Sequence, residues 1–377
     1  DVLAAEPPDD PDPEDTPPTP GPGLSPGSAL PDTTILTSSG LTPQTPLTPH
    51  SLLSDTAAVQ AALPTLLAAP VFGLDTETTG LDPHRDRLRL VQLATSERVY
   101  LIDAFAVDPG LLRPVLESEQ VKVLHNAKFD LQFLLARGLT VKNTFDTMLA
   151  DQLLRGSRVA RSLADLASEH LGQTLDKTLQ TSDWSGRLTP SMLAYAARDA
   201  AVLVPLHAKL TAALKDHQLE RVAALENRAV PAVAWLEYSG APFDTEAWHQ
   251  LADSALAEKL RLEDELTALA EELAGKNTLF ERRINWDAPE QVKKLLAECG
   301  IRVPNTTEDA LLPLAEQHLL VKKLLEYREV AKRCGTYGLN VLGDVHPVTG
   351  RIHADWKQIG ADSGRMACTR PNLQNVP

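Results

Sequence analysis

The chain has 377 residues, enough for about two or three domains, and a formal net charge of −15, which argues against binding nucleic acid through overall charge. Its three cysteines, Cys299, Cys334 and Cys368, form no CxxC pair, which excludes a disulfide framework and a cysteine zinc site and indicates a reducing cytosol. No stretch is apolar over the length needed to cross a membrane, so we expect no membrane partner.

Residues 1–50 differ in composition from the rest of the chain. They hold 13 of the 28 prolines and eight Asp or Glu residues, with no Lys or Arg. Because this segment lacks the apolar periodicity of a core, we expect it to be disordered or extended, and a tether rather than a partner-binding tail. This segment supplies −8 of the formal net charge of −15. The remaining charge of −7 on the rest of the chain is compatible with a local basic groove.

The first globular region, residues 52–213, is expected to hold successive strands and then alternating strand and helix, which predicts an α/β fold with a mixed sheet. An expected helix over 52–67 opens it. Expected strands follow at 70–75, 88–93, 99–102 and 121–124. The short link at 95–97 predicts a hairpin between the second and third of these strands. Asn126 is the expected N-cap of the helix after the fourth, and helical patterns then continue to about residue 213.

A second region, residues 216–345, is predicted to be mostly helical. Asp244 is the expected N-cap of a helix that contains Trp248, and a long helix is expected to end near Gly275. Four leucines share one predicted face of this long helix, at positions 262, 266, 269 and 273. In residues 346–377, a turn at 347–350 precedes an expected strand at 351–356.

Asp75 and Glu77 lie at the end of the first buried strand pattern. Residues at i and i+2 of a strand point to the same face, so the two carboxylates lie side by side. Such acids are ordinary on an edge strand, but burying two anions together is costly unless a cation neutralises them. The pair therefore predicts a divalent metal held by oxygen ligands.

Two later segments carry residues that fit the same site. Asp130 follows Asn126 by one helical turn, and Tyr195 and Asp199 are four residues apart on a helix that Thr189 opens as N-cap. Taken singly, a helical Asp is usually a surface charge and a Tyr/Asp pair a local helix contact. Four carboxylates and a tyrosine in this order predict one site.

These three segments resemble the motifs of the DEDDy 3′→5′ exonucleases, which have a ribonuclease H-like fold. The resemblance implies two divalent metal ions, Mg²⁺ or Mn²⁺. It implies that Asp75, Glu77 and Asp199 bind the first ion and that Asp75 bridges to the second. Asp130 then acts there mainly through water, and Tyr195 positions the attacking water.

The chemistry of phosphodiester hydrolysis agrees with this assignment. Two ions about 3.5–4 Å apart stabilise the attacking and the leaving oxygen and acidify the water. We expect a nucleoside 5′-monophosphate to be released from a 3′ end. Leu81 matches a position that wedges against the terminal bases in polymerase exonucleases, and the alternative for Leu81 is a core leucine.

The C-terminal segment, residues 363–377, resembles the signature of family A DNA polymerases, the bacterial DNA polymerase I family. It departs from Thr-Gly-Arg-Leu-Ser-Ser at Ser363 and at 366–368. The segments 285–289 and 325–337 are similar to parts of that family's thumb. The resemblance implies a thumb at 216–345 and the start of a palm at 346–377. It also implies that four side chains contact primer–template DNA: Arg365, Asn372, Gln374 and Asn375. Together with Leu81 and Asn126 in the exonuclease domain, these are the expected DNA-binding residues.

We therefore expect the proofreading exonuclease, thumb and first palm strands of a family A DNA polymerase, monomeric and in the bacterial cytoplasm near the nucleoid, or encoded by a phage. Both ends look cut, at Asp1 and Pro377, ahead of the family's palm aspartates, so we expect no primer extension by this chain. A ribonuclease D-like RNA exonuclease is an alternative that the C-terminal signature disfavours. A non-catalytic DNA-binding part is another, which the four carboxylates disfavour.

Overall fold

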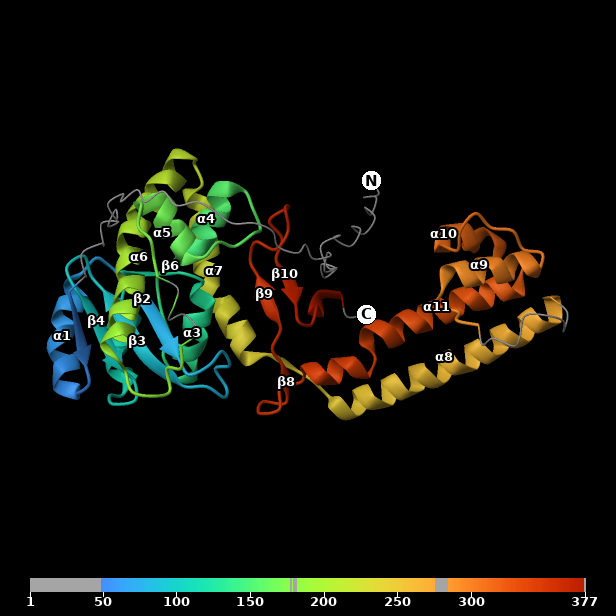
Figure 1. The fold of residues 1–377 in the computed structure, drawn as a ribbon, viewed down its shortest axis with the longest axis horizontal. Coiled ribbons are helices and arrows are strands. Elements are labelled where there is room, and N and C mark those ends of the chain that lie inside the picture. Colours follow the sequence, from blue (N-terminus) through green and yellow to red (C-terminus); the bar gives the residue numbers. More distant parts are fainter. Residues whose placement is uncertain (1–48, 177, 179–181, 275–283, 376–377) are drawn as a thin grey trace, which may run out of the picture. The chain divides into compact units, whose positions relative to one another are not determined.

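The computed structural model describes residues 49–375 except 177, 179–181 and 275–283, so almost all of the predicted tether and the expected helix end at Gly275 lie outside the described residues. The first globular region is built on a six-stranded mixed sheet with helices on both faces (Figure 1). The strands lie in the order β1-β4-β3-β2-β5-β6. Their bounds are β1 His50–Leu53, β2 Val71–Thr78, β3 Leu88–Ala94, β4 Val99–Asp103, β5 Val121–Leu124 and β6 Thr144–Asp146.

The pairing agrees with the predicted mixed sheet and hairpin. Strand β3 runs antiparallel to both β2 and β4, whereas β1 pairs parallel with β4, and β5 pairs parallel with β2 and β6. The helices of this region are α1 Thr56–Ala68, η1 Pro109–Leu112, α2 Arg113–Leu116, α3 Ala127–Ala136, α4 Thr147–Arg155, α5 Leu163–Leu171, α6 Pro190–Asp216 and α7 Glu220–Ser239. One core packs α1, α3 and α7 on one face of the sheet, and α6 packs on the other face.

The expected helix over 52–67 is wrong at its start. Leu52 belongs to β1 and pairs with Leu101 of β4. The helix begins only at Thr56, because Asp55 caps it by accepting a hydrogen bond from Ala58 N at 2.8 Å. A four-residue strand next to a helix offers too short a pattern to be separated from the helix by periodicity. The three-residue strand β6 was not predicted for the same reason.

Asn126 does not cap α3 as expected. It occupies the N-cap position with a left-handed backbone (φ 56°) instead of the extended backbone of a capping residue, and its side chain makes no capping bond. The carboxylate of Asp146, at the end of β6, accepts from Asn126 N at 3.1 Å and from Ala127 N at 2.8 Å. The same carboxylate accepts from Met148 N at 2.8 Å and so caps α4 as well.

The helical region that follows has its own core. Its helices are α8 Thr245–Ala274, α9 Pro289–Glu298, α10 Glu308–Leu311, η2 Leu312–Leu314, α11 Leu319–Tyr337 and η3 Leu339–Asp344. Asp244 caps α8 as predicted, accepting from Ala247 N at 3.0 Å. Leu262 and Leu266 of α8 are buried in this core, but Leu273 is 53% exposed, so the predicted leucine face fails at its last member.

The expected strand over 351–356 is divided in two. Strand β8 (Arg351–Ile352) pairs with β7 (Ala241–Pro242), whereas β9 (Asp355–Lys357) pairs with β10 (Ala367–Thr369), and the short helix η4 (Leu373–Asn375) follows. Between the two halves, His353 Nδ1 lies 2.7 Å from Glu237 O. The chain changes pairing partner there, which alternation of residues cannot indicate. Among the described residues, no helix has the length and apolarity needed to cross a membrane.

Candidate functional site

Strand β2 carries the two predicted metal carboxylates in the interior of the sheet, which excludes the edge-strand interpretation of these acids. Gly73, Asp75 and Glu77 alternate onto the face that α6 covers. A Cβ on Gly73 would lie 2.4 Å from Ala200 O and 3.0 Å from Leu203 Cβ. Glycine at this position therefore lets α6 lie directly on β2, and this close approach places Asp199 of α6 near the two strand carboxylates.

Asp130 reaches the site from the opposite face of the sheet. It lies on α3 and is 3% exposed, and Thr76 Oγ1 donates a hydrogen bond to its Oδ1 at 2.6 Å. Thr76 points away from Asp75 and Glu77 because neighbouring strand residues alternate between faces. The sequence patterns predict no role for Thr76, although strand alternation and its place between two motif acids are the signal that could have indicated one.

The pKa values of the four carboxylates are all raised, by burial and for Asp75 and Glu77 also by the charges of the other acids. Burial, followed by the charges of Asp130, Glu77 and Asp199, raises the pKa of Asp75 well above its usual range. Burial and then the charges of Asp199 and Asp130 raise the pKa of Glu77 to about 9. Burial raises the pKa of Asp130 to about 7, although the Thr76 hydrogen bond opposes it. Burial likewise raises the pKa of Asp199 to about 6.

Tyr195 belongs to the same cluster. The predicted N-cap of its helix is present, since Met192 N donates to Thr189 Oγ1 at 3.3 Å. The Tyr195 hydroxyl hydrogen-bonds to Asp199, and burial together with the Asp199 charge raises the pKa of the phenol well above its usual range. Tyr195 therefore keeps its proton at neutral pH, so it can orient a water or a phosphate by hydrogen bonding but cannot serve as a base.

The donor set fits a hard divalent cation, because carboxylate oxygens are the ligands such ions prefer and the raised pKa values reflect crowded negative charge. Within the described residues, however, no group of three or more His, Cys, Asp or Glu side chains has the spacing of a formed metal site. The structure thus brings the predicted acids together without arranging them as a finished coordination shell.

The other predicted DNA-binding residues lie on two separate segments. Leu81 follows β2 and is 82% exposed, so the alternative of a core leucine is wrong. Arg365 is exposed next to β10. The side-chain amide of Gln374 donates to Met366 O at 3.2 Å and accepts from Cys368 N at 3.1 Å. It is therefore bonded to the backbone of the chain itself at residues 366 and 368. The carboxamide of Asn372 likewise accepts from Gln374 N at 3.0 Å. The Asn375 side chain lies outside what the structure describes.

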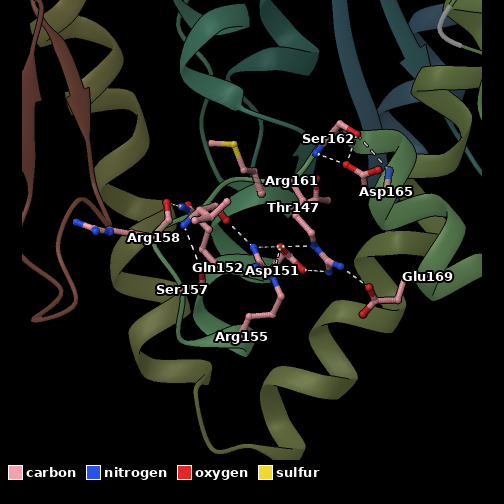
Figure 2. A network of polar contacts seen from close by, with 12 residues as sticks. Thr147, Asp151, Gln152, Arg155, Ser157, Arg158, Arg161, Ser162, Asp165 and Glu169 are labelled. Atoms are coloured by element: carbon pink, nitrogen blue, oxygen red, sulfur yellow. Dashed lines mark hydrogen bonds and ion pairs between the residues drawn. The ribbon is translucent and has the colours of Figure 1, made fainter. Parts of the chain in front are cut away.

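An ion-pair network supports the connection between α4 and α5 (Figure 2). Asp151 is 1% exposed and accepts from Arg155 Nε at 2.9 Å and from Arg161 Nε at 3.1 Å. Gln152 Nε2 donates to Arg158 O at 2.8 Å. The guanidinium of Arg161 also bonds Glu169 of α5, so two cations and two anions hold the 156–162 segment in place.

A second network joins α3 to the C-terminal strands. Lys128 Nζ lies 2.7 Å from Glu237 Oε1 of α7 and 2.6 Å from Asp355 Oδ1 of β9. Glu237 Oε1 also accepts from Trp356 N at 2.6 Å. Because Lys128 is two residues from Asp130, this network ties the helix that carries a site carboxylate to the segment that precedes β10.

Comparisons with known proteins agree with this organisation. The family described as 3′-5′ exonuclease matches residues 51–215, and DNA polymerase family A matches residues 253–377. A DNA polymerase I from Aquifex aeolicus is 33% identical over 347 residues, which cover 84% of this chain and 56% of the relative. A DNA polymerase I from Pseudomonas aeruginosa is 30% identical over 367 residues, which cover 87% of this chain and 39% of the relative. The chain thus spans about half or less of the length of these relatives.

Among solved structures, the POL domain of Pol1 from M. smegmatis, in complex with DNA primer-template and dNTP, superposes with a TM-score of 0.64. The match covers 86% of this chain and 56% of that chain. At 22% sequence identity the likeness concerns the fold. It agrees with the α/β sheet region followed by a mostly helical one.

Proposed function

The chain belongs to the family A DNA polymerases and includes a 3′-5′ exonuclease domain, and on this basis we propose that it removes nucleotides from DNA 3′ ends with the help of divalent cations. The biological role we propose is proofreading, in which a mispaired primer end is the substrate. The single observation that supports this proposal is the cluster of four mutually repelling carboxylates that β2, α3 and α6 bring together.

The proposed roles follow from the position of each side chain. Asp75, Glu77 and Asp199 would hold the cations directly, and Asp130, which Thr76 holds by a hydrogen bond, would act mainly through water. When bound, the cations would supply positive charge at the attacking and leaving oxygens. Tyr195, protonated at neutral pH, would orient the water from its place beside Asp199.

Leu81 and Asn126 are the proposed contacts to the strand end. The 82% exposed Leu81 offers an apolar surface directly after β2, against which the terminal base can pack. Asn126 lies at the start of α3, where its backbone N–H is occupied by Asp146 and its half-buried side chain is left for the substrate.

The test is digestion of a 3′-labelled single-stranded DNA oligonucleotide in the presence of Mn²⁺. We expect Asp75→Ala combined with Glu77→Ala to lower the rate by about a thousandfold or more, since about 4 kcal/mol of transition-state stabilisation is removed. Glu97→Ala, an exposed acid in the β3–β4 hairpin, is the matched control and should digest like the unmodified chain. An unchanged rate in the double variant would contradict the site assignment.

The two alternatives are separated by substrate and by cation binding. Membership of a DNA polymerase family favours DNA, so we expect a DNA oligonucleotide to be digested faster than an RNA of the same sequence. Faster digestion of RNA would favour the hypothesis of a ribonuclease D-like RNA exonuclease instead. Titration calorimetry with Mn²⁺ addresses the non-catalytic alternative, because an inert domain would bind no Mn²⁺.

We also propose that the C-terminal half contacts primer–template DNA. A cleft of about 790 Å³ between α8, α9 and α11 is lined by four cationic side chains, Lys259, Lys293, Arg328 and Lys332, and by two acidic ones, Asp287 and Glu290. Lys259 is paired with Asp287 at 3.0 Å, so the other three are the proposed phosphate contacts. Cations of this kind bind phosphates without regard to base sequence, as a polymerase requires. Exposed Arg365 would add a contact from the palm segment. The domain boundaries, the monomeric state and the bacterial or phage cytoplasmic location stay predictions.

A further inference from the structure

Gln92 is a fully buried amide next to the carboxylates of the candidate site. It lies in β3 directly opposite Asp75 of β2, and its side chain is 0% exposed. Its strand neighbours at i−2 and i+2, Leu90 and Ala94, pack in the core that α6 covers. Strand alternation therefore places the Gln92 amide on the same face as Asp75 and Glu77.

The amide is only half satisfied. Gln92 Nε2 donates to Glu77 Oε1 at 3.3 Å, whereas Gln92 Oε1 has no hydrogen-bond partner among the described residues. Leaving a buried acceptor unpaired destabilises the folded state. A valine or leucine at this interior strand position would pack without that cost. Gln92 therefore lowers the stability of the folded chain, which is expected of a residue whose second partner arrives with a ligand.

The chemistry of the surroundings specifies the kind of partner. An amide oxygen accepts hydrogen bonds, so the missing group is a donor, and beside the site carboxylates it has to be compatible with a bound cation. Water held by a divalent cation is such a donor. Side chains that orient the ligands of a metal in this way affect both the affinity for the ion and the placement of its waters.

We propose that Gln92 is a positioning residue of the exonuclease site, whose N–H orients the Glu77 carboxylate toward the cation and whose carbonyl oxygen accepts a hydrogen bond from a water of that site. This inference rests on the proposed function. Gln92 touches no reacting atom and acts through Glu77 and through water.

The test replaces Gln92 with leucine, which has a similar volume and no polar atoms. For Gln92→Leu we expect a Mn²⁺ affinity about 10-fold or more below that of the unmodified chain by titration calorimetry. In the metal-free protein we expect an unfolding midpoint equal to or above that of the unmodified chain, because a buried unpaired acceptor is removed. A purely structural glutamine would give the opposite pair of results, lower stability and unchanged Mn²⁺ affinity.

Gln132→Leu is the matched control. Gln132 Nε2 also donates to a carboxylate, Glu237 Oε2, at 2.7 Å, but that carboxylate lies outside the site, so Mn²⁺ affinity should not change. In oligonucleotide digestion, Gln92→Leu should lower kcat at limiting Mn²⁺, and kcat should return to that of the unmodified chain when Mn²⁺ is saturating. The KM for the oligonucleotide should not change. If Gln92→Leu does not fold, Gln92→Met gives the same comparison with an unbranched side chain.

The outcomes separate this inference from the proposed function. An unmodified chain that neither binds Mn²⁺ nor digests the oligonucleotide would overturn the proposed function itself. An unmodified chain that does both, together with a Gln92→Leu variant of equal Mn²⁺ affinity, would overturn only the role of Gln92.

Discussion

Asp146 offers a quantitative test of how the helix carrying Asp130 is held. Its carboxylate accepts three backbone hydrogen bonds, from Asn126 N at 3.1 Å, Ala127 N at 2.8 Å and Met148 N at 2.8 Å. The side chain is 2% exposed, so water does not replace these bonds when it is removed. Asp146→Ala therefore uncaps α3 and α4 together.

The expected loss of stability is the sum of two effects. Removing an N-cap costs about 1 kcal/mol for each helix. Buried N–H groups left without an acceptor cost about 1–3 kcal/mol each, although part of this cost is already included in the capping value. We therefore expect Asp146→Ala to lower the free energy of unfolding by about 3–5 kcal/mol. Asp146→Asn should lose less, because the carboxamide keeps one acceptor oxygen.

The assay is urea unfolding followed by far-ultraviolet circular dichroism, with Asp55→Ala as the matched control. Asp55 caps a single helix, α1, through one exposed bond to Ala58 N at 2.8 Å, so its loss should be about 1 kcal/mol. If Asp146→Ala destabilises the chain no more than Asp55→Ala does, the double-capping argument is refuted.

Other buried charges lead to three further predictions. Lys128→Ala leaves Glu237, 7% exposed, without its cation, so urea unfolding should show a loss of about 3–5 kcal/mol, and an unchanged midpoint would contradict the buried pair. In the metal-free chain the pKa of Glu77 rises from 4.5 to about 9 on folding, so the folded state binds the extra proton. Stability should then fall as pH rises from about 5 to 9 and recover with added Mn²⁺, and a flat profile would count against the raised pKa. Burial acts to raise the pKa of Asp151, but hydrogen bonds from Arg161 and Arg155 outweigh it and lower that pKa. Asp151→Asn should therefore be less stable than the unmodified chain at pH 7, and the difference should begin to shrink as pH falls below about 4; a difference that does not shrink at all as pH falls would argue against the ion pairs.

Features that depend on neighbours in sequence were predictable from the sequence alone. Asp75 and Glu77 share a face because strand residues alternate, and Tyr195 and Asp199 project together because they are four apart on a helix. The Thr189 cap and the Asp244 cap were found from residue type and position. The family assignment was equally available, since its signatures are contiguous runs of residues.

Features that depend on contacts between distant segments were decided only by the tertiary structure. No local pattern shows that Asp146 caps the helix for which Asn126 was expected, or that Thr76 bonds to Asp130, 54 residues away. The exposure of Leu81 and the division of the 351–356 strand also depend on which segments pack beside them. A pattern along the chain records which face a side chain takes, whereas its partner is set by the packing of elements that are far apart in sequence. For this reason the sequence was enough to predict the acids of the candidate site, whereas only the fold decided that Gly73 lets α6 approach β2 and that Gln92 lies opposite Asp75.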